Sequence, residues 1–458
     1  MQCLLFILLD KGIFKYLCHE VKDCIKLKIK VMENFRFNSG FITQKITRLF
    51  VLMLLVLPLS VMAESNEIAE ERVTLIRGKI VDASSNEPLI FATVSVAGSN
   101  IATVCNTEGE FLLKVPNELL ERNVEFSHIG FEMKSIPIKN LQSPSNRIEM
   151  NMISVSLVEV SVFPSDPDLL IRAVMNRRAD NYMDVAMHKT AFYRESVRRG
   201  WSYVSLTEAV VEIYKHPYNR AREDQVRLKI GRKSTDYGRM DTLAFRIQGG
   251  PFSALMLDIM KDPYTLFDEE MLQYYNFTMA NLTKVDDRLL YVLDFEQKKD
   301  VNIPLFYGSL YIDTKTLAVT NAEFRMNIED RDEAARIFIR KRPIGARVWP
   351  TETYYQVNYR EHDGRWYFGH ARAQLSFRVN WRRRLFNRNY HTTMEIAVTD
   401  WRETDDRPFR ASDRLRMNVI MEDAVEGFAN ENFWGDYNVI EPEQPIENAI
   451  RRIQRSLD

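Results

Sequence analysis

The chain has 458 residues, of which 45% are hydrophobic and 27% are charged, and its formal net charge is −1. This is the composition of a globular protein with room for about two to four domains. Residues 1–63 carry nine basic and four acidic residues, which leaves 53 basic and 59 acidic residues in the remainder. Because that remainder is mildly acidic, the composition argues against nucleic acid as a partner.

The N-terminal region has the pattern of a signal peptide that begins at Met32. Basic residues precede an apolar run, and Val61 and Ala63 are the small side chains that a signal peptidase requires, so we expect residues 32–63 to be removed. The apolar run is shorter than the roughly 20 residues that span a bilayer. We therefore expect an exported protein of the periplasm or outer membrane, without a transmembrane helix in its mature chain.

Two further expectations follow from this reading of the N-terminus. Residues 1–31 are interpreted as upstream sequence included in the reading frame by mistake, and the alternative is a genuine cytosolic extension. Only Cys105 remains after cleavage, and it does not follow the cut directly. The mature chain can therefore form no intramolecular disulfide, and a lipoprotein anchor is not expected.

Residues 73–150 read as a small all-β domain. Short alternating segments such as "VTLIRGKIVD" and "FATVSVAG" are separated by turn residues, which is typical of a β-sandwich. Gly109 lies where "TEGE" must reverse the chain, a position that suits a residue tolerant of positive φ. The sequence therefore predicts a sandwich that uses Gly109 in a tight turn.

Specific residues of this region give it a family resemblance. It resembles the carboxypeptidase-regulatory-like domain, a transthyretin-like β-sandwich, in the order of Gly78, Val81-Asp82, Glu87-Pro88-Leu89, Ala92-Thr93-Val94, Asn106, Gly109, Phe111 and "FSHIGFE". The family usually has Thr-Asp where this chain has Cys105-Asn106. The resemblance implies a domain that carries no active site of its own.

Residues 151–189 are predicted to form a linker and a helix, with Asp166 as N-cap and Pro167 in the first turn.

From residue 190 to 458, period-two alternation predicts long antiparallel strands, and Asp363-Gly364 has the sequence of a two-residue hairpin turn. We expect a large meander that curls into a half-barrel-like sheet. The segment "GGPFSALMLDIMKD" has helical spacing, and a terminal helix with an apolar stripe is predicted from Pro445. The fold class is therefore mainly β with a few helices.

The sequence contains no recognised catalytic or metal-binding pattern. The histidines of the mature chain do not form H-x-H or H-E-x-x-H; they are His128, His188, His216, His362, His370 and His391. His362 and His370 flank the predicted hairpin turn, where we expect surface histidines without a role. No G-x-S-x-G motif or phosphate-binding glycine loop occurs, and Cys105 is interpreted as a small buried thiol. We expect no cofactor and no enzymatic activity.

Two basic loops suggest a binding surface. Both are predicted at the end of the hairpin opposite Asp363-Gly364, next to Trp349, Trp381 and Tyr390. Positive charge there would suit an anionic lipid headgroup or acidic glycan, although solvated arginines, or arginines paired with acidic neighbours, are the simpler alternative. The rim consists of Arg340, Lys341, Arg342, Arg347, Arg382, Arg383, Arg384 and Arg388.

The sandwich, the stretch "GSLYIDTKTLAVTNAEF" and the ending "FWGDYN" together make the chain similar to uncharacterised cell-envelope proteins of Gram-negative bacteria. The leading hypothesis is a non-enzymatic envelope protein, whose sandwich docks a partner and whose sheet binds a ligand or another envelope protein. One alternative is an envelope hydrolase that uses carboxylates in the concave sheet. Another is a small outer-membrane barrel or a component related to receptors that carry the same sandwich.

Overall fold

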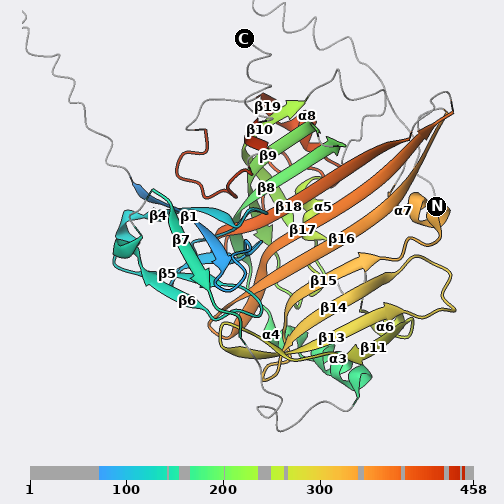
Figure 1. Ribbon diagram of the computed structural model, residues 1–458, viewed down its shortest axis with the longest axis horizontal. Coiled ribbons are helices and arrows are strands. Elements are labelled where there is room, and N and C mark those ends of the chain that lie inside the picture. The colour runs from blue at the N-terminus through green and yellow to red at the C-terminus, as the bar shows by residue number, and fades with distance from the viewer. Residues whose placement is uncertain are drawn as a thin grey trace, which may run out of the picture. The chain divides into compact units, whose positions relative to one another are not determined.

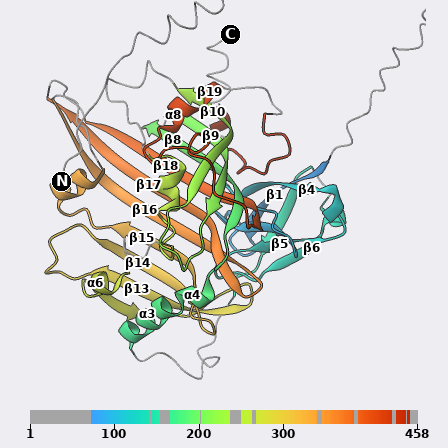
Figure 2. The same cartoon turned by 180° about the vertical axis from the view of Figure 1, so that it is seen from behind.

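The computed structural model describes most of the chain between residues 72 and 448, and Figures 1 and 2 show it from opposite sides. The described residues are 72–141, 144–153, 166–200, 202–235, 249–261, 267–338, 345–382, 387–427, 433–443 and 446–448. The predictions on residues 1–63 lie outside them, and so does the predicted terminal helix beyond residue 448.

The N-terminal part is the predicted β-sandwich. Its two sheets have the strand orders β4-β1-β7 and β3-β2-β5-β6, and all neighbours are antiparallel except β1 and β7. The strands are β1 (Val73–Asp82), β2 (Thr93–Val96), β3 (Ala102–Val104), β4 (Glu110–Pro116), β5 (Asn123–Ser127), β6 (Lys134–Pro137) and β7 (Asn146–Met150). Two short 3₁₀ helices, η1 (Asn117–Leu119) and η2 (Ile138–Asn140), follow β4 and β6.

The sandwich has its own hydrophobic core, in which Phe111 and Phe126 pack edge to face at a centroid distance of 5.6 Å. Cys105 is fully buried in this core, as expected, and burial raises the pKa of its thiol well above the usual range. Gly109 adopts a φ of 74°, and a Cβ there would lie 2.6 Å from the backbone oxygen of Ile80. The predicted turn therefore requires glycine for both its conformation and its close approach.

The second part is a large, curled antiparallel sheet, as predicted. Its order is β11-β13-β14-β15-β16-β17-β18-β8-β9-β10-β19, and β12 pairs with β13 outside this path. The strands are β8 (Met187–Arg199), β9 (Ser202–Lys215), β10 (Gln225–Thr235), β11 (Tyr275–Met279), β12 (Thr283–Val285), β13 (Arg288–Gln297), β14 (Phe306–Asp313), β15 (Val319–Met326), β16 (Ala346–His362), β17 (Arg365–Trp381), β18 (Arg388–Glu403) and β19 (Glu426–Gly427).

The order of the strands is not one continuous meander. Strand β18 returns to pair with β8, so the first long strand of the sheet lies in its interior (Figure 1). Among the strands that the structure describes in this sheet, only the short pairing of β10 with β19 is parallel, and the edge strands β11 and β19 are not paired with each other, so the sheet is open. Two meanders, β8 to β10 and β11 to β18, are thus joined through the β18–β8 pair.

The hairpin between β16 and β17 has the predicted turn. His362 and Arg365 pair across it, and the two residues between them have positive φ, 49° at Asp363 and 81° at Gly364. Positive φ at both central positions defines a type I′ turn, which matches the twist of the flanking strands.

Short helices cover one face of the sheet, here called the inner face. They are α3 (Pro167–Asn176), α4 (Arg178–Asn181), α5 (Pro251–Leu255), α6 (Glu269–Leu272), α7 (Arg331–Phe338) and α8 (Met421–Ala424). Asp166 caps α3 as predicted, because its Oδ1 accepts hydrogen bonds from Asp168 N and Leu169 N at 2.9 and 3.2 Å. Helix α5 is shorter than the spacing of "GGPFSALMLDIMKD" suggested, yet Leu255, Ile259 and Met260 are all buried.

The opposite face of the sheet, the outer face, packs against the sandwich through a cluster that includes Val104, Leu112, Phe192 and Ala397. Among the described residues, no helix is both long and apolar enough to cross a membrane.

Candidate functional site

A segment near the end of the chain, residues 433–443, links the sandwich to the outer face of the sheet. We call it the strap. The side chain of Asn438 accepts a hydrogen bond from Lys114 N at 2.7 Å and donates one to Lys114 O at 2.9 Å. On the sheet side, Arg194 donates to Ile440 O at 2.8 Å. The strap therefore holds the two domains through polar as well as apolar contacts.

Under the strap, charged side chains form a ladder across neighbouring strands of the outer face. The ladder is Arg232 on β10, Glu208 on β9, Arg194 on β8, Glu395 on β18 and Arg372 on β17, and each residue is in register with the next. Glu208 forms two ion pairs: its Oε1 lies 2.8 Å from Arg194 Nε and its Oε2 lies 2.7 Å from Arg232 Nη2. Alternating charge on directly opposed residues is the favourable arrangement in a sheet.

Glu395 is the second carboxylate of the ladder. Burial alone would raise the pKa of its carboxyl, but the charge of Arg372 and a hydrogen bond from His370 outweigh burial and lower this pKa to about 2. His370 Nε2 and Arg372 Nη1 both lie 3.2 Å from Glu395 Oε1. Glu395 is therefore a carboxylate at neutral pH.

The sandwich reaches this ladder through Phe91. Its ring stacks on His370 at a centroid distance of 5.6 Å and lies 4.5 Å from the guanidinium carbon of Arg372. Phe91 has a φ of 60°, which is unusual for a bulky side chain and costs about 1–3 kcal/mol. These contacts hold Phe91 in that conformation and place its ring at the edge of a groove.

The groove lies between the sandwich and the outer face of β14 to β17, and its volume is about 510 Å³. The sandwich contributes Phe91 and Glu125 to its lining, among others, while the sheet contributes residues such as Tyr311, Gln356 and Asn358. A hollow of this volume is in the range of small-molecule sites, which also form preferentially where domains meet.

Four residues that line the groove carry buried polar atoms without a hydrogen-bond partner. The atoms are Gln356 Oε1, Asn358 Oδ1, Trp366 Nε1, and Nη1 and Nη2 of Arg360. Gln356 is 8% exposed and Trp366 4% exposed. Since each unpaired buried polar atom costs about 1–3 kcal/mol, such a concentration favours a site whose polar groups are satisfied by water or a ligand.

The position of Arg360 depends on a glycine in the next strand. Its side chain lies across Gly369, where a Cβ would be 3.0 Å from Arg360 Cγ. At this point the pairing of β16 with β17 shifts between Asn358 and Tyr359, which is a β-bulge. The bulge and the glycine together let the guanidinium group lie at the groove.

Three carboxyl groups that line the groove have raised pKa values. Burial raises the pKa of Asp286 against a hydrogen bond from Ser127, and burial together with the charge of Asp286 raises the pKa of Glu125. Burial also raises the pKa of Glu323, against a hydrogen bond with Tyr354. Glu125 belongs to the sandwich and Asp286 to the β12–β13 turn, so acidic groups from both domains meet here.

A separate polar cluster occupies the inner face and is internally paired. Lys215 Nζ lies 2.8 Å from Asp224 Oδ2 and 2.7 Å from Asp258 Oδ2. The hydroxyls of Tyr218 and Tyr359 donate to Asp258 at 2.8 and 2.9 Å. Because these charges are buried and satisfied by one another, we interpret the cluster as a cross-link between β9, β16 and the segment after α5.

Lys189 is a second buried lysine, close to the far side of the groove. His370 and Ala397 are the last paired residues at this end of β17 and β18. Two residues further along β17, the backbone oxygen of Phe368 accepts a hydrogen bond from Lys189 Nζ at 3.0 Å. Its Nζ lies 4.7 Å from the ring centre of Tyr367, a groove residue. Burial and the charge of Lys215 lower the pKa of Lys189 well below the usual range. Lys189 is 2% exposed, so its side chain packs behind Tyr367 and not in the open groove.

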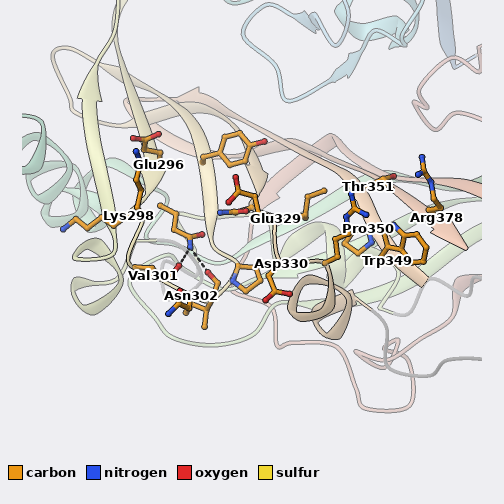
Figure 3. Close-up of a pocket in the computed structure, with 18 residues that line it drawn as sticks. Glu296, Lys298, Val301, Asn302, Glu329, Asp330, Trp349, Pro350, Thr351 and Arg378 are labelled. Carbon is orange, nitrogen blue, oxygen red and sulfur yellow. Dashed lines mark hydrogen bonds between the residues drawn. The ribbon is translucent and has the colours of Figure 1, made fainter. Parts of the chain in front are cut away.

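A second, larger hollow of about 1040 Å³ lies at the other end of the sheet. Figure 3 shows Glu296 and Lys298 at one end of it and Trp349 and Arg378 at the other. Asp330, also in its lining, caps α7 by accepting from Asp332 N and Glu333 N. Its charged lining is mostly exposed and carries both signs of charge.

The predicted basic rim is only partly within the described residues. Arg347 and Arg382 are exposed and Arg388 is half-buried, and all three lie at the end of β16 to β18 opposite the Asp363-Gly364 turn. The other members, Arg340, Lys341, Arg342, Arg383 and Arg384, lie outside the described residues. The rim as an anionic-ligand site stays a prediction.

The two histidines near the hairpin turn do not come together. His362 pairs with Arg365, whereas His370 pairs with Asn358 and is 1% exposed. The expectation of a surface histidine is therefore wrong for His370, because the sandwich covers this part of the sheet. Among the described residues, no group of three or more His, Cys, Asp or Glu side chains is arranged to hold a metal ion.

One serine does lie beside a histidine. Ser376 Oγ is 2.8 Å from His391 Nδ1 and donates to Glu352 Oε2 at 3.2 Å. In a catalytic triad the acid orients the imidazole, whereas here the carboxylate bonds to the serine. None of the three residues lines the groove or the larger hollow, so nothing places a substrate beside the serine.

Comparison with known proteins agrees with the resemblance of the N-terminal part. The model of the CarboxypepD_reg-like domain matches residues 76–162. None of the curated proteins matches the chain. One similar solved structure is the crystal structure of a DUF1329 family protein from Desulfovibrio piger, with 12% identity, 54% of this chain and 99% of that chain covered, and a TM-score of 0.24. At that TM-score the likeness carries no argument about ligand or activity.

Proposed function

We propose that this is a non-enzymatic cell-envelope protein that binds a small polar ligand in the groove between its sandwich and its sheet. The observation that carries the proposal is the set of unpaired buried polar atoms on Gln356, Asn358, Arg360 and Trp366, four residues that line one groove. A ligand that supplies hydrogen bonds there would remove the cost of leaving those atoms unpaired.

The sandwich supports this function as a wall of the site. The domain family that its sequence resembles is expected to lack an active site, and here the strap fixes it against the sheet through Asn438. Sites between domains are a common location for ligands. Export to the periplasm or outer membrane is part of the proposal, and it rests on the signal-peptide pattern of residues 32–63.

One observation favours the alternative of an envelope hydrolase. Glu125, Asp286 and Glu323 line the same groove, and burial raises all three pKa values. A carboxylic acid with a raised pKa can act as a general acid. If a bound probe is converted to product, and Glu125→Gln or Asp286→Asn stops the conversion, the protein is a hydrolase.

Thermal-shift measurements on the purified chain test the binding function. The probes are maltotriose, trigalacturonate, glutamate, ATP and inorganic phosphate, each added to the wild type and to Asn358→Leu. We expect at least one probe to raise the melting temperature of the wild type and to have a smaller effect on the variant. If no probe acts, or if the variant responds as the wild type does, the groove is not the binding site.

A further inference from the structure

We infer that the ligand of the groove is an uncharged saccharide. This inference rests on the proposed binding function and names the chemical class of its ligand. The argument uses the mixture of donors and acceptors in the groove, the aromatic rings at its edges and the charge of its walls.

The unpaired atoms are of both hydrogen-bonding kinds. Trp366 Nε1 and the two guanidinium nitrogens of Arg360 are donors, whereas Gln356 Oε1 and Asn358 Oδ1 are acceptors. An inorganic anion would satisfy the donors only, and an apolar molecule would satisfy neither kind. A sugar hydroxyl both donates and accepts, so a polyhydroxylated ring matches the whole set.

Aromatic rings from both domains stand at the groove. Phe91 belongs to the sandwich and Tyr311 to β14, and both side chains are partly exposed. Amphipathic ligands such as sugar rings present an apolar face that packs on an aromatic ring while their hydroxyls reach polar groups. The volume of about 510 Å³ suits a short saccharide, whereas a folded partner requires a wider surface.

The charge of the walls disfavours an acidic ligand. Glu125, Asp286 and Glu323 all line the groove, and a negatively charged ligand would raise their pKa values further or be repelled. The basic group beside them, Arg288, is already paired, with Glu361 at 2.9 Å and Asp313 at 3.6 Å. Arg360 is the one guanidinium of the described groove lining with unpaired buried nitrogens, and it can donate to neutral hydroxyls.

Isothermal titration calorimetry with three trisaccharide probes tests the ligand class. Neutral maltotriose and cellotriose are compared with trigalacturonate, which has similar size and hydroxyl content but carries carboxylates. We expect a neutral trisaccharide to bind the wild type, and Gln356→Leu to weaken it about tenfold because a buried polar partner is lost. Gln374→Leu is the matched control, because Gln374 lies on β17 outside the groove lining, and its affinity should stay within about twofold.

Phe91→Leu is a second variant, which removes the ring but no hydrogen-bonding group, and it should also weaken neutral saccharides. Circular dichroism melts of each variant establish that it is folded. If neither neutral trisaccharide binds, the inference is overturned. If trigalacturonate binds and the neutral trisaccharides do not, and Gln356→Leu abolishes that binding, the ligand is not an uncharged saccharide but the groove remains the binding site. If Gln356→Leu and Gln374→Leu both bind every probe as the wild type does, the groove is not the binding site.

Discussion

The side chain of Asn438 bonds both backbone polar groups of Lys114, although the two residues are 324 positions apart in the chain. The amide accepts from the N–H and donates to the C=O, as the backbone of a neighbouring strand would. Both residues are buried, with 7% of Asn438 and 9% of Lys114 exposed. One side chain thus completes the hydrogen bonding of β4 where the strap crosses it.

Replacing Asn438 with alanine should loosen the sandwich from the sheet. The variant leaves Lys114 N and Lys114 O without their partner, so we expect a loss of about 2 kcal/mol in the free energy of unfolding. Hydrogen exchange at β3 and β4 should become faster while exchange in the core of the large sheet is unchanged. Asn389→Ala, at an exposed position of β18, is the control and should alter neither. Unchanged exchange at β4 in Asn438→Ala would contradict this role.

Glu195 should make the protein less stable as the pH rises. Burial raises the pKa of its carboxyl to about 8, against a hydrogen bond from Tyr193. The folded state therefore binds the proton more tightly than the unfolded state, whose pKa is near 4.5. The stabilisation is complete below the unfolded pKa and is lost as the pH rises through the folded pKa.

Denaturant unfolding between pH 5 and pH 8 tests this expectation. The wild type should lose as much as about 4 kcal/mol more across this range than Glu195→Gln, whose amide does not titrate. Glu403→Gln, at an exposed position of β18, should follow the wild type. Equal slopes for the wild type and Glu195→Gln would show that the buried group does not hold its proton.

Glu395 should have the opposite pH dependence. Its folded pKa of about 2 lies below the ordinary value of 4.5, so its contribution is present above pH 4.5 and is lost as the pH falls through about 2. At pH 7, Glu395→Gln should cost about 3 kcal/mol, because Arg372 loses a buried ionic partner. The difference from the wild type should shrink towards pH 2, measured by urea unfolding. A constant difference would mean that the loss comes from packing and not from charge.

The basic rim should bind anionic membranes if its arginines act together. Replacing Arg382, Arg383 and Arg384 with serine should reduce cosedimentation with vesicles that contain phosphatidylglycerol, and high salt should do the same to the wild type. Vesicles of phosphatidylcholine alone should bind neither protein. If salt does not change binding by the wild type, or if the variant binds as the wild type does, the rim has no role in membrane binding.

The matched control for the rim uses three exposed arginines on the loop after β18, which begins at the opposite end of that strand. They are Arg407, Arg410 and Arg414, each replaced with serine. The two variants lose the same charge, so a defect confined to the rim variant reports the position of the charge and not its amount.

The sequence was most informative where the structure is local. Period-two alternation predicted the strands because each side chain faces either core or surface, and Asp363-Gly364 predicted a turn that needs positive φ at both positions. Pairing of β18 with β8 was not predictable in this way, because alternation does not identify which distant strand is the neighbour. The curled sheet was therefore predicted without its order.

The groove could not be predicted from the sequence for a related reason. Gln356 and Asn358 are single polar residues at outward positions of a strand, and such residues are ordinarily solvated. Gln356 is buried and Asn358 is half-buried because a domain more than two hundred residues earlier in the chain covers them. The same cover explains His370, which has the pattern of a surface residue and is 1% exposed. A polar residue on a strand gave no signal of the domain that would be placed over it.

The position of the strap also sets an order of assembly. Residues 433–443 come after every strand that the structure describes in the sandwich and in the sheet, so they are synthesised when both cores can already have formed. Until Asn438 and Ile440 reach their partners, the sandwich is tethered to the sheet only through its connecting chain and direct contacts. A chain interrupted before residue 433 would then contain both domains without the contacts of the strap, and the groove between them would be fixed last.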